Sequence, residues 1–248
     1  MAYYDFLNII FFPLLKLPAL WAVILLSLLV SVIIILITKY MTDQSLMKRL
    51  KEEMKENQKL SKEFKNNANK LMEIQRKQME LTMEQFKHSL KPTLITFIPI
   101  ILIFGWMSSI FAYESIKPNQ EFSVTVFFEK NTNGNVELII SEELEIVDDS
   151  TKKIENDKAE WTLKGEEGEH ILEFIYNNEK QQYSVLITND NKYLSPTKKT
   201  EGAIKTIQVN YIPKKMLNLF GWKLGWLGTY IIFSIIFTMG LRKLMKVY

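Results

Sequence analysis

With 248 residues, a formal net charge of +3 and no cysteine, the chain lacks the strongly basic balance of nucleic-acid-binding proteins and cannot be cross-linked by disulfides. Its two histidines, His88 and His170, are far apart, and it has neither a Gly-rich phosphate loop nor a Gly-x-Ser-x-Gly elbow. These features disfavour a histidine-based metal site and an enzyme, so we expect a non-enzymatic protein without a cofactor.

The N-terminal segment, residues 1–16, is rich in Phe, Tyr and Leu and carries one Asp and one Lys. Pro13 and Pro18 separate it from the apolar residues that follow. Because aromatic side chains are enriched at membrane–water interfaces, we predict a short interfacial helix in the outer leaflet. A partly embedded lead-in to the first membrane span fits the same residues.

Three blocks of the sequence contain no charged residue and are rich in Leu, Ile, Val or Phe: residues 17–38, 92–113 and 224–241. At a rise of about 1.5 Å per residue, roughly 20 residues cross a hydrocarbon core about 30 Å thick. We therefore predict three transmembrane helices. The ends of the blocks argue against a cleaved signal peptide and a cleaved GPI signal, because Lys39-Tyr40 follows the first and Arg242 the third.

The distribution of charge predicts the orientation of the chain. Residues 39–91 contain 13 Lys or Arg against 8 Asp or Glu, and the tail, residues 242–248, adds three cations and no anion. Residues 114–223 contain 14 cations against 19 anions. By the positive-inside rule, 39–91 and the C-terminus are cytoplasmic, while the N-terminus and 114–223 lie outside a multi-pass cell-membrane protein.

The basic segment, residues 39–91, has the pattern of two helices, each with an apolar stripe among Lys and Glu. Asp43 can cap the first helix, and the polar residues 65–69 suit a turn. The second helix is expected to end before Pro92. Because both ends must return to the same membrane face, we predict an antiparallel coiled-coil hairpin.

The segment from residue 114 to 223 changes to a period of two, with turn signals such as Asn133-Gly134-Asn135 between short apolar runs. About seven short strands in about 95 residues predict an extracellular β-sandwich of immunoglobulin-like type, whose topology the absence of cysteine leaves open. The predicted strands cover residues 122–128, 136–140, 144–147, 159–163, 170–176, 182–188 and 204–212.

Polar side chains within the predicted spans suggest a groove open to the cytoplasm. At 100° per residue, those of the first span share one face and those of the third follow an i, i+4, i+8 line. Water in such a groove would lower the cost of placing polar peptide in the membrane. Close packing of transmembrane helices is the alternative explanation. The groove candidates are Ser27, Ser31, Thr38, Lys39, Thr93, Thr96, Tyr230, Ser234, Thr238 and Arg242.

Methionine is concentrated in or beside the predicted hairpin. Because its side chain is flexible and polarizable, a Met-lined surface can accept varied apolar sequences. The same residues could instead form a loosely specified hairpin core, and the basic arms could be a solvated face or contact ribosomal RNA or anionic lipid. The candidates for capturing an apolar segment are Met47, Met54, Met72, Met79 and Met83.

Several runs occur in the order and spacing of one family: TDQ at 42–44, MKRLKEEM at 47–54, MEIQ at 72–75, HSLKPTLITF at 88–97, ILIFGW at 101–106, GWLGTY at 225–230 and LRKL at 241–244. In these runs the chain resembles archaeal membrane proteins of the Oxa/YidC/Alb insertase superfamily. Those proteins are related to the third subunit of the ER membrane protein complex and to the TMCO and Get receptor proteins.

The resemblance implies an N-out core of three helices, a cytoplasmic coiled-coil hairpin and a groove that helps nascent membrane proteins enter the bilayer. It implies nascent membrane proteins and lipids as partners, with the ribosome and a small membrane subunit as further candidates. Two departures stand out. The bacterial insertases carry an arginine in the groove, whereas the spans here have no internal charge. The insertase core also leaves the β-rich segment unexplained.

We therefore predict a membrane protein insertase or insertase-like chaperone that admits transmembrane segments through a polar groove. The alternative is a membrane-anchored receptor or adhesion subunit that acts through its outer β domain. An ion-conducting subunit is less favoured, because a cation path usually has acidic rings or carbonyl filters and these spans are uncharged.

Overall fold

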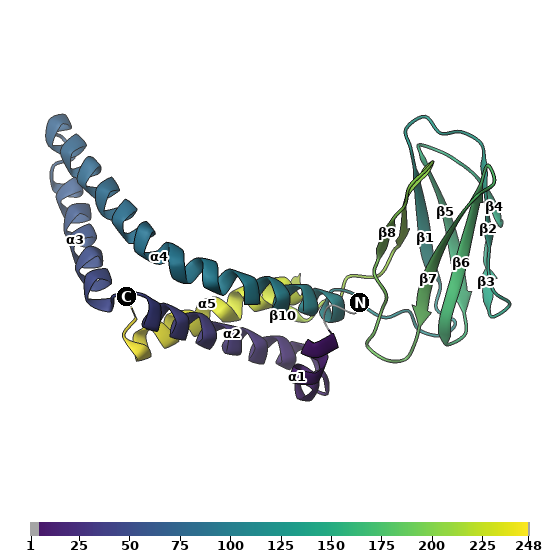
Figure 1. Cartoon of the computed structure of the whole chain (residues 1–248), viewed down its shortest axis with the longest axis horizontal. Coiled ribbons are helices and arrows are strands. Elements are labelled where there is room, and N and C mark those ends of the chain that lie inside the picture. The colour runs from purple at the N-terminus through teal and green to yellow at the C-terminus, as the bar shows by residue number, and fades with distance from the viewer. Residues whose placement is uncertain (1–4, 248) are drawn as a thin grey trace. The chain divides into compact units, whose positions relative to one another are not determined.

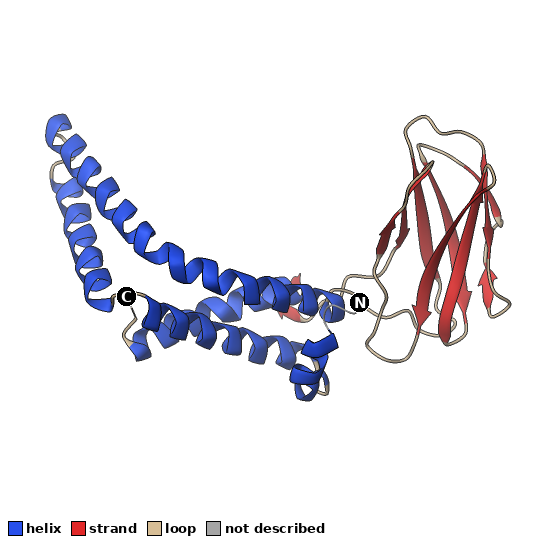
Figure 2. Ribbon diagram, in the orientation of Figure 1, coloured by secondary structure: helices blue, strands red, loops and turns tan. Residues whose placement is uncertain are grey.

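The computed structural model describes residues 5–247 and divides into two compact units. One unit consists of helices and comprises Met1–Gly105 and Leu227–Tyr248, and the other, Trp106–Trp226, is mainly β structure (Figures 1 and 2). Residues 1–4 of the predicted interfacial segment and residue 248 of the predicted tail lie outside the described residues.

Three helices in the described part of the chain are long and apolar enough to cross a membrane: α2, α4 and α5. They confirm the three predicted apolar spans, while the interfacial position of the shorter apolar helix α1 stays a prediction. The helices of the described residues are α1 (Asp5–Leu15), α2 (Ala19–Met41), α3 (Gln44–Glu63), α4 (Ala68–Phe111) and α5 (Trp226–Met245).

Helix α3 begins at the residue that the sequence marks as a cap. Asp43 accepts hydrogen bonds from the backbone N–H groups of Ser45 and Leu46 at 2.9 and 3.1 Å, which confirms it as the cap of α3. The Ser45 hydroxyl and these N–H groups lower the pKa of the Asp43 carboxyl, because they stabilise its charged form. At the start of α4, the side chain of Asn67 accepts from the Lys70 N–H at 3.1 Å.

The predicted second arm of the coiled-coil hairpin and the second apolar block form one continuous helix, α4, which has 44 residues and contains Pro92 and Pro99. The coiled-coil packing of the hairpin stays a prediction. The sequence predicts that a helix ends before Pro92, because proline lacks the N–H that an α-helix needs, and this prediction is wrong. The carbonyl that loses its backbone donor at Pro92 is that of His88, four residues earlier. Two hydroxyls add hydrogen bonds to other carbonyls of this stretch: Thr93 Oγ1 donates to the Ser89 carbonyl at 2.7 Å and Thr96 Oγ1 to that of Thr93 at 2.9 Å.

The main body of the β unit consists of two antiparallel sheets, with strand orders β3-β5-β1-β9-β8 and β4-β2-β6-β7 (Figure 2). This arrangement confirms a β-sandwich, and all seven predicted strands are present. Its immunoglobulin-like type and extracellular location stay predictions. The strands are β1 (Phe122–Phe128), β2 (Asn135–Ile139), β3 (Leu144–Ile146), β4 (Thr151–Lys153), β5 (Lys158–Gly165), β6 (Gly168–Tyr176), β7 (Glu179–Ile187), β8 (Thr197–Lys199) and β9 (Ile204–Val209).

The core of the sandwich is built around Trp161 on β5 and Phe174 on β6, which are both fully buried with ring centroids 5.4 Å apart. The indole N–H of Trp161 donates to the Ser150 carbonyl at 3.1 Å, so the buried polar atom is satisfied. Along β5 the buried residues alternate with exposed or half-buried ones, as expected for a strand with one face in the core. Large apolar side chains thus hold the sheets together without a disulfide.

Three tyrosines connect the sandwich to the last turn of α4. The Tyr193 hydroxyl donates to the Ser108 carbonyl and accepts from the Ala112 N–H. The Tyr193 ring packs edge-on against Tyr113 at 5.5 Å, and Tyr211 lies 5.6 Å from Tyr193. Burial raises the pKa of Tyr193 to about 12, because the charged phenolate would lose its hydration.

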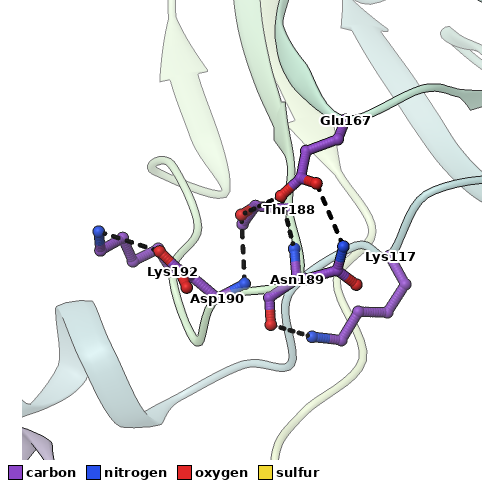
Figure 3. Close-up of polar contacts among 6 residues, drawn as sticks. All are labelled: Lys117, Glu167, Thr188, Asn189, Asp190 and Lys192. Carbon is purple, nitrogen blue, oxygen red and sulfur yellow. Dashed lines mark hydrogen bonds and ion pairs between the residues drawn. The ribbon is translucent and has the colours of Figure 1, made fainter.

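The turn between β5 and β6 is tied to the end of β7 by Glu167 (Figure 3). Its carboxylate accepts hydrogen bonds from the Thr188 hydroxyl at 3.2 Å and from the backbone N–H of Asn189 at 3.1 Å. Lys117 donates to the Asn189 carbonyl at 2.8 Å. Hydrogen bonds from Asn189 and Thr188 lower the pKa of Glu167. The segment that enters the sandwich is therefore fastened to it.

A separate hairpin precedes α5. Its strands, β10 (Leu217–Leu219) and β11 (Trp222–Leu224), form a two-stranded sheet of their own. Phe220 and Gly221 make the turn, both with positive φ (51° and 94°), and the Asn218 side chain accepts from the Gly221 N–H at 3.0 Å.

Candidate functional site

Part of the predicted groove is a closed seam between α2 and α5. Ser31 is 1% exposed, and its hydroxyl lies 3.3 Å from Thr238 Oγ1 and 3.5 Å from the Ser234 carbonyl. Ser27 is fully buried and donates to the Ile24 carbonyl of its own helix at 2.7 Å. Ser31 and Thr238 therefore form a polar contact between the two helices, as small polar residues often do in membranes, whereas the hydroxyls of Ser27 and Ser234 donate to carbonyls of their own helices.

Two further groove candidates are also buried. Tyr230 on α5 is 6% exposed and packs edge-on against Phe104 of α4, with ring centroids 4.8 Å apart. Thr96 on α4 is 6% exposed. Tyr230 thus belongs to a contact between α4 and α5, whereas the Thr96 hydroxyl donates to the Thr93 carbonyl of its own helix.

A cavity of about 410 Å³ opens where four helices meet, at the ends of α2 and α5 and the base of the α3–α4 hairpin. It brings together Thr38, Thr93 and Arg242 of the groove candidates with Met47 and Met54 of the capture candidates. The full set of lining residues is Thr38, Thr42, Met47, Lys51, Met54, Lys55, Gln58, Gln85, Ser89, Pro92, Thr93 and Arg242.

The lining of the cavity is polar and positively charged. Lys51, Lys55 and Arg242 contribute three cations, and no acidic side chain lines the space. The other polar groups that line the cavity are side-chain amides and hydroxyls. Among these, Thr42 Oγ1 donates to the Thr38 carbonyl at 2.6 Å. Such a cavity can hold water and polar peptide next to apolar helix surfaces.

An apolar stripe on α4 carries the remaining capture candidates. At 100° per residue, its members lie within an arc of about 80°. Leu81 and Ile103, which are buried, lie on the opposite face. The members, with their exposed fractions, are Met72 (63%), Met79 (67%), Met83 (51%), Phe86 (56%), Leu90 (39%), Leu94 (63%), Phe97 (57%) and Ile101 (51%). We call this set the α4 stripe.

Comparison with known proteins gives one match. Residues 8–138, over half of the chain, match the family described as "Integral membrane protein EMC3/TMCO1-like". The chain belongs to this family. The comparison with curated proteins found no match, and neither did the comparison with solved structures.

Membership of the EMC3/TMCO1-like family confirms the resemblance found in the sequence and makes the chain a multi-pass membrane protein. The family suggests a function related to membrane protein insertion in general terms. The match includes α2, α3 and α4, and thus most of the cavity and the whole α4 stripe, and it ends within β2. The archaeal origin stays a prediction.

Within this EMC3/TMCO1-like chain, seven of the twelve residues that line the cavity are not among the residues predicted from the sequence. Gln85 and Ser89 precede Thr93 at i, i+4, i+8 on α4, and Lys51, Lys55 and Gln58 share one face of α3 with Met47 and Met54. This helical spacing was a usable signal. Lys39 is half-buried and does not line the cavity. In residues 5–247, no group of three or more His, Cys, Asp or Glu is placed to hold a metal ion.

Proposed function

We propose that the protein is a membrane protein insertase that works without a nucleotide or cofactor. An apolar segment of a nascent membrane protein binds the part of the α4 stripe on the hairpin, Met72 to Phe86, and moves along the stripe toward the apolar part of α4. The hairpin and the C-terminus are cytoplasmic in this proposal, because these segments carry the excess of positive charge.

The continuity of the α4 stripe is the observation that carries the proposal. Leu94, Phe97 and Ile101 belong to the apolar block that fits a bilayer, where exposed apolar side chains meet lipid. Met79 and Met83 continue the same face into a stretch of α4 rich in Lys and Glu, where water would surround them. Exposed apolar surface of this kind marks an interaction site.

The cavity provides a hydrated site for the polar residues that flank the apolar segment of the client, which the α4 stripe cannot bind. It lies at the base of the hairpin, where Pro92 and Thr93 of α4 line it. Hydroxyls, amides and water there reduce the penalty for taking polar groups out of bulk water. Burial of the apolar segment in lipid, at about 25 cal/mol for each Å² of apolar surface, provides the driving force.

Site-specific photocrosslinking tests the proposal. A photoreactive residue at Met79 or Met83 is expected to crosslink to a stalled nascent chain that carries a transmembrane segment, and not to one that lacks it. Lys77 is the matched control, because it is exposed on the same arm and lies outside the α4 stripe. Equal crosslinking from Lys77 and Met79, or none from any position in the folded protein, would refute capture by the stripe.

A receptor or adhesion subunit is the second candidate, because the sandwich is a large folded unit that can bind a partner by itself. The β unit has its own core, with Trp161 and Phe174 fully buried. In that case the helices serve as an anchor, and loss of the sandwich abolishes all function.

A further inference from the structure

The hairpin β10–β11 pairs with neither sheet of the sandwich. An isolated two-stranded hairpin is at best marginally stable in water, unless one of its faces is covered. Each arm of this hairpin has only three residues, Leu217–Leu219 and Trp222–Leu224. Its surroundings must therefore contribute to its stability.

One face of the hairpin is apolar. The register pairs Leu217 with Leu224 and Leu219 with Trp222, whereas Asn218 pairs with Lys223. Side chains alternate between the faces of a strand, so the first two pairs share one face and the polar pair lies on the other. Trp222 is 77% exposed even though it belongs to the apolar face.

The turn of the hairpin exposes an aromatic ring at a position with an unfavourable backbone conformation. Phe220 has φ +51°, a region that aromatic residues rarely adopt, and its side chain is fully exposed. Asn or Gly is the usual residue in two-residue turns with positive φ. Phe220 is fully exposed and makes no packing contact that would explain its selection over Asn, so its ring is free to contact a partner outside the protein.

Chain connectivity indicates what covers the apolar face. The hairpin ends at Leu224, and α5, one of the three candidate spans, begins at Trp226. At about 3.3 Å per residue, the three-residue arms keep the tip within roughly 10 Å of the base of the hairpin. The headgroup region on each side of a bilayer is itself about 5–8 Å thick. The hairpin therefore lies within or next to the headgroup region when α5 spans the bilayer.

We propose that β10–β11 is a membrane-interface anchor, in which Phe220 and Trp222 insert between lipid headgroups and upper acyl chains. Lys223, on the opposite face, contacts lipid phosphates. Aromatic side chains favour this depth, and cations favour anionic headgroups. The anchor is independent of the proposed insertase function and depends only on α5 crossing the membrane.

Spin labelling tests the position of the tip. The chain has no cysteine, so Phe220→Cys gives one labelling site in the full-length protein. In vesicles of phosphatidylcholine and phosphatidylglycerol, we expect the ratio of oxygen to nickel-complex collisions to be several-fold higher at residue 220 than at residue 171. Ile171→Cys is the control, since Ile171 is 54% exposed on the sandwich. Equal ratios would overturn the proposal, and so would shielding from both reagents, which would indicate a protein cover.

A second variant keeps the turn of the hairpin and removes the aromatic ring that is proposed to contact lipid. Phe220→Asn suits the positive φ and removes the ring, so the hairpin keeps its geometry. We expect quenching of Trp222 by lipids brominated in the upper acyl chain, measured as the difference from Trp222→Phe, to fall several-fold in this variant. Unchanged quenching in Phe220→Asn would show that the ring does not hold the hairpin in lipid, and would also overturn the proposal.

Discussion

The backbone N–H of Glu114 donates a hydrogen bond to the carbonyl of Ile212 at 2.9 Å, although the whole sandwich separates them in sequence. The N–H of Lys214 likewise donates to the Ala112 carbonyl at 2.9 Å, and Tyr113 pairs with Pro213. The segments that enter and leave the sandwich thus form a short antiparallel ladder. The sandwich is an insertion at one point of the chain.

Replacement of residues 115–211 by a short Gly-Ser turn should therefore leave the helical unit folded. We expect this variant to keep most of its insertion activity, measured with a transmembrane client in reconstituted vesicles, because the cavity and the α4 stripe are intact. Circular dichroism and thermal unfolding provide the control for folding. A folded variant without any activity would favour the receptor function instead.

Substitution in the seam between α2 and α5 should affect stability. Ser31→Leu adds volume at a position that is 1% exposed, and overpacking typically costs about 1–3 kcal/mol. We expect a lower midpoint of thermal unfolding in detergent. Thr93→Leu in the cavity, an exposed position, is the comparison and should reduce insertion while unfolding stays unchanged. Equal stability of the two variants would contradict the closed seam.

Charge on the α4 stripe should reduce insertion without unfolding the protein. Met79→Glu and Met83→Glu replace side chains that are 67% and 51% exposed, so little packing is lost. We expect a several-fold decrease in crosslinking to apolar clients, because a carboxylate disfavours binding of an apolar segment. The control is Thr82→Glu, an exposed position between them that lies off the stripe. A similar decrease in Thr82→Glu would argue for a general charge effect.

Removal of a buried amide from α3 should stabilise the hairpin. Asn57 is 4% exposed, and its Nδ2 atom has no hydrogen-bond partner. An unsatisfied buried donor costs about 1–3 kcal/mol, so Asn57→Leu is expected to raise the free energy of unfolding by a similar amount. Thermal unfolding in detergent measures the gain. Asn66→Leu in the exposed turn should change stability by less than about 0.5 kcal/mol.

Two buried tyrosines of the β unit should reduce its folding stability at alkaline pH. Burial raises the pKa of Tyr193 and of Tyr183 to about 12, against about 10 in the unfolded chain. Between these values the unfolded chain loses protons that the folded chain keeps, so stability is complete below pH 10 and falls toward pH 12. Denaturant unfolding at pH 9 to 12 should show this fall. The double variant Tyr183→Phe, Tyr193→Phe should show a smaller fall, and an identical one would contradict the assignment.

The sequence predicted those strands and helices that are specified by a pattern of neighbouring residues. Short runs of alternating apolar and polar residues predicted β1, β5 and β6, and Asp43 marked the start of α3. The strands β4 and β8 were missed, because both read Thr-Lys-Lys and have no apolar alternation. They are edge strands, which exist because β2 and β9 offer backbone hydrogen bonds to them.

Contacts between helices were less predictable. Spacing placed Ser27, Ser31 and Thr38 on one face of α2, but it could not tell that only Thr38 reaches the cavity. Ser31 is closed off by Thr238 of α5, a contact that depends on how the two helices pack. Helical period therefore identifies a polar face, whereas tertiary packing decides whether that face is open.

The α4 stripe on the hairpin arm is made of methionine where leucine would be equally apolar. Met72 and Met79 are more than half exposed, so their thioethers are open to oxidants. Conversion to the sulfoxide turns a flexible apolar side chain into a polar one, and reductases can reverse it. Oxidative stress would thus make this surface polar, and repair would restore its affinity for apolar segments without new synthesis of the protein.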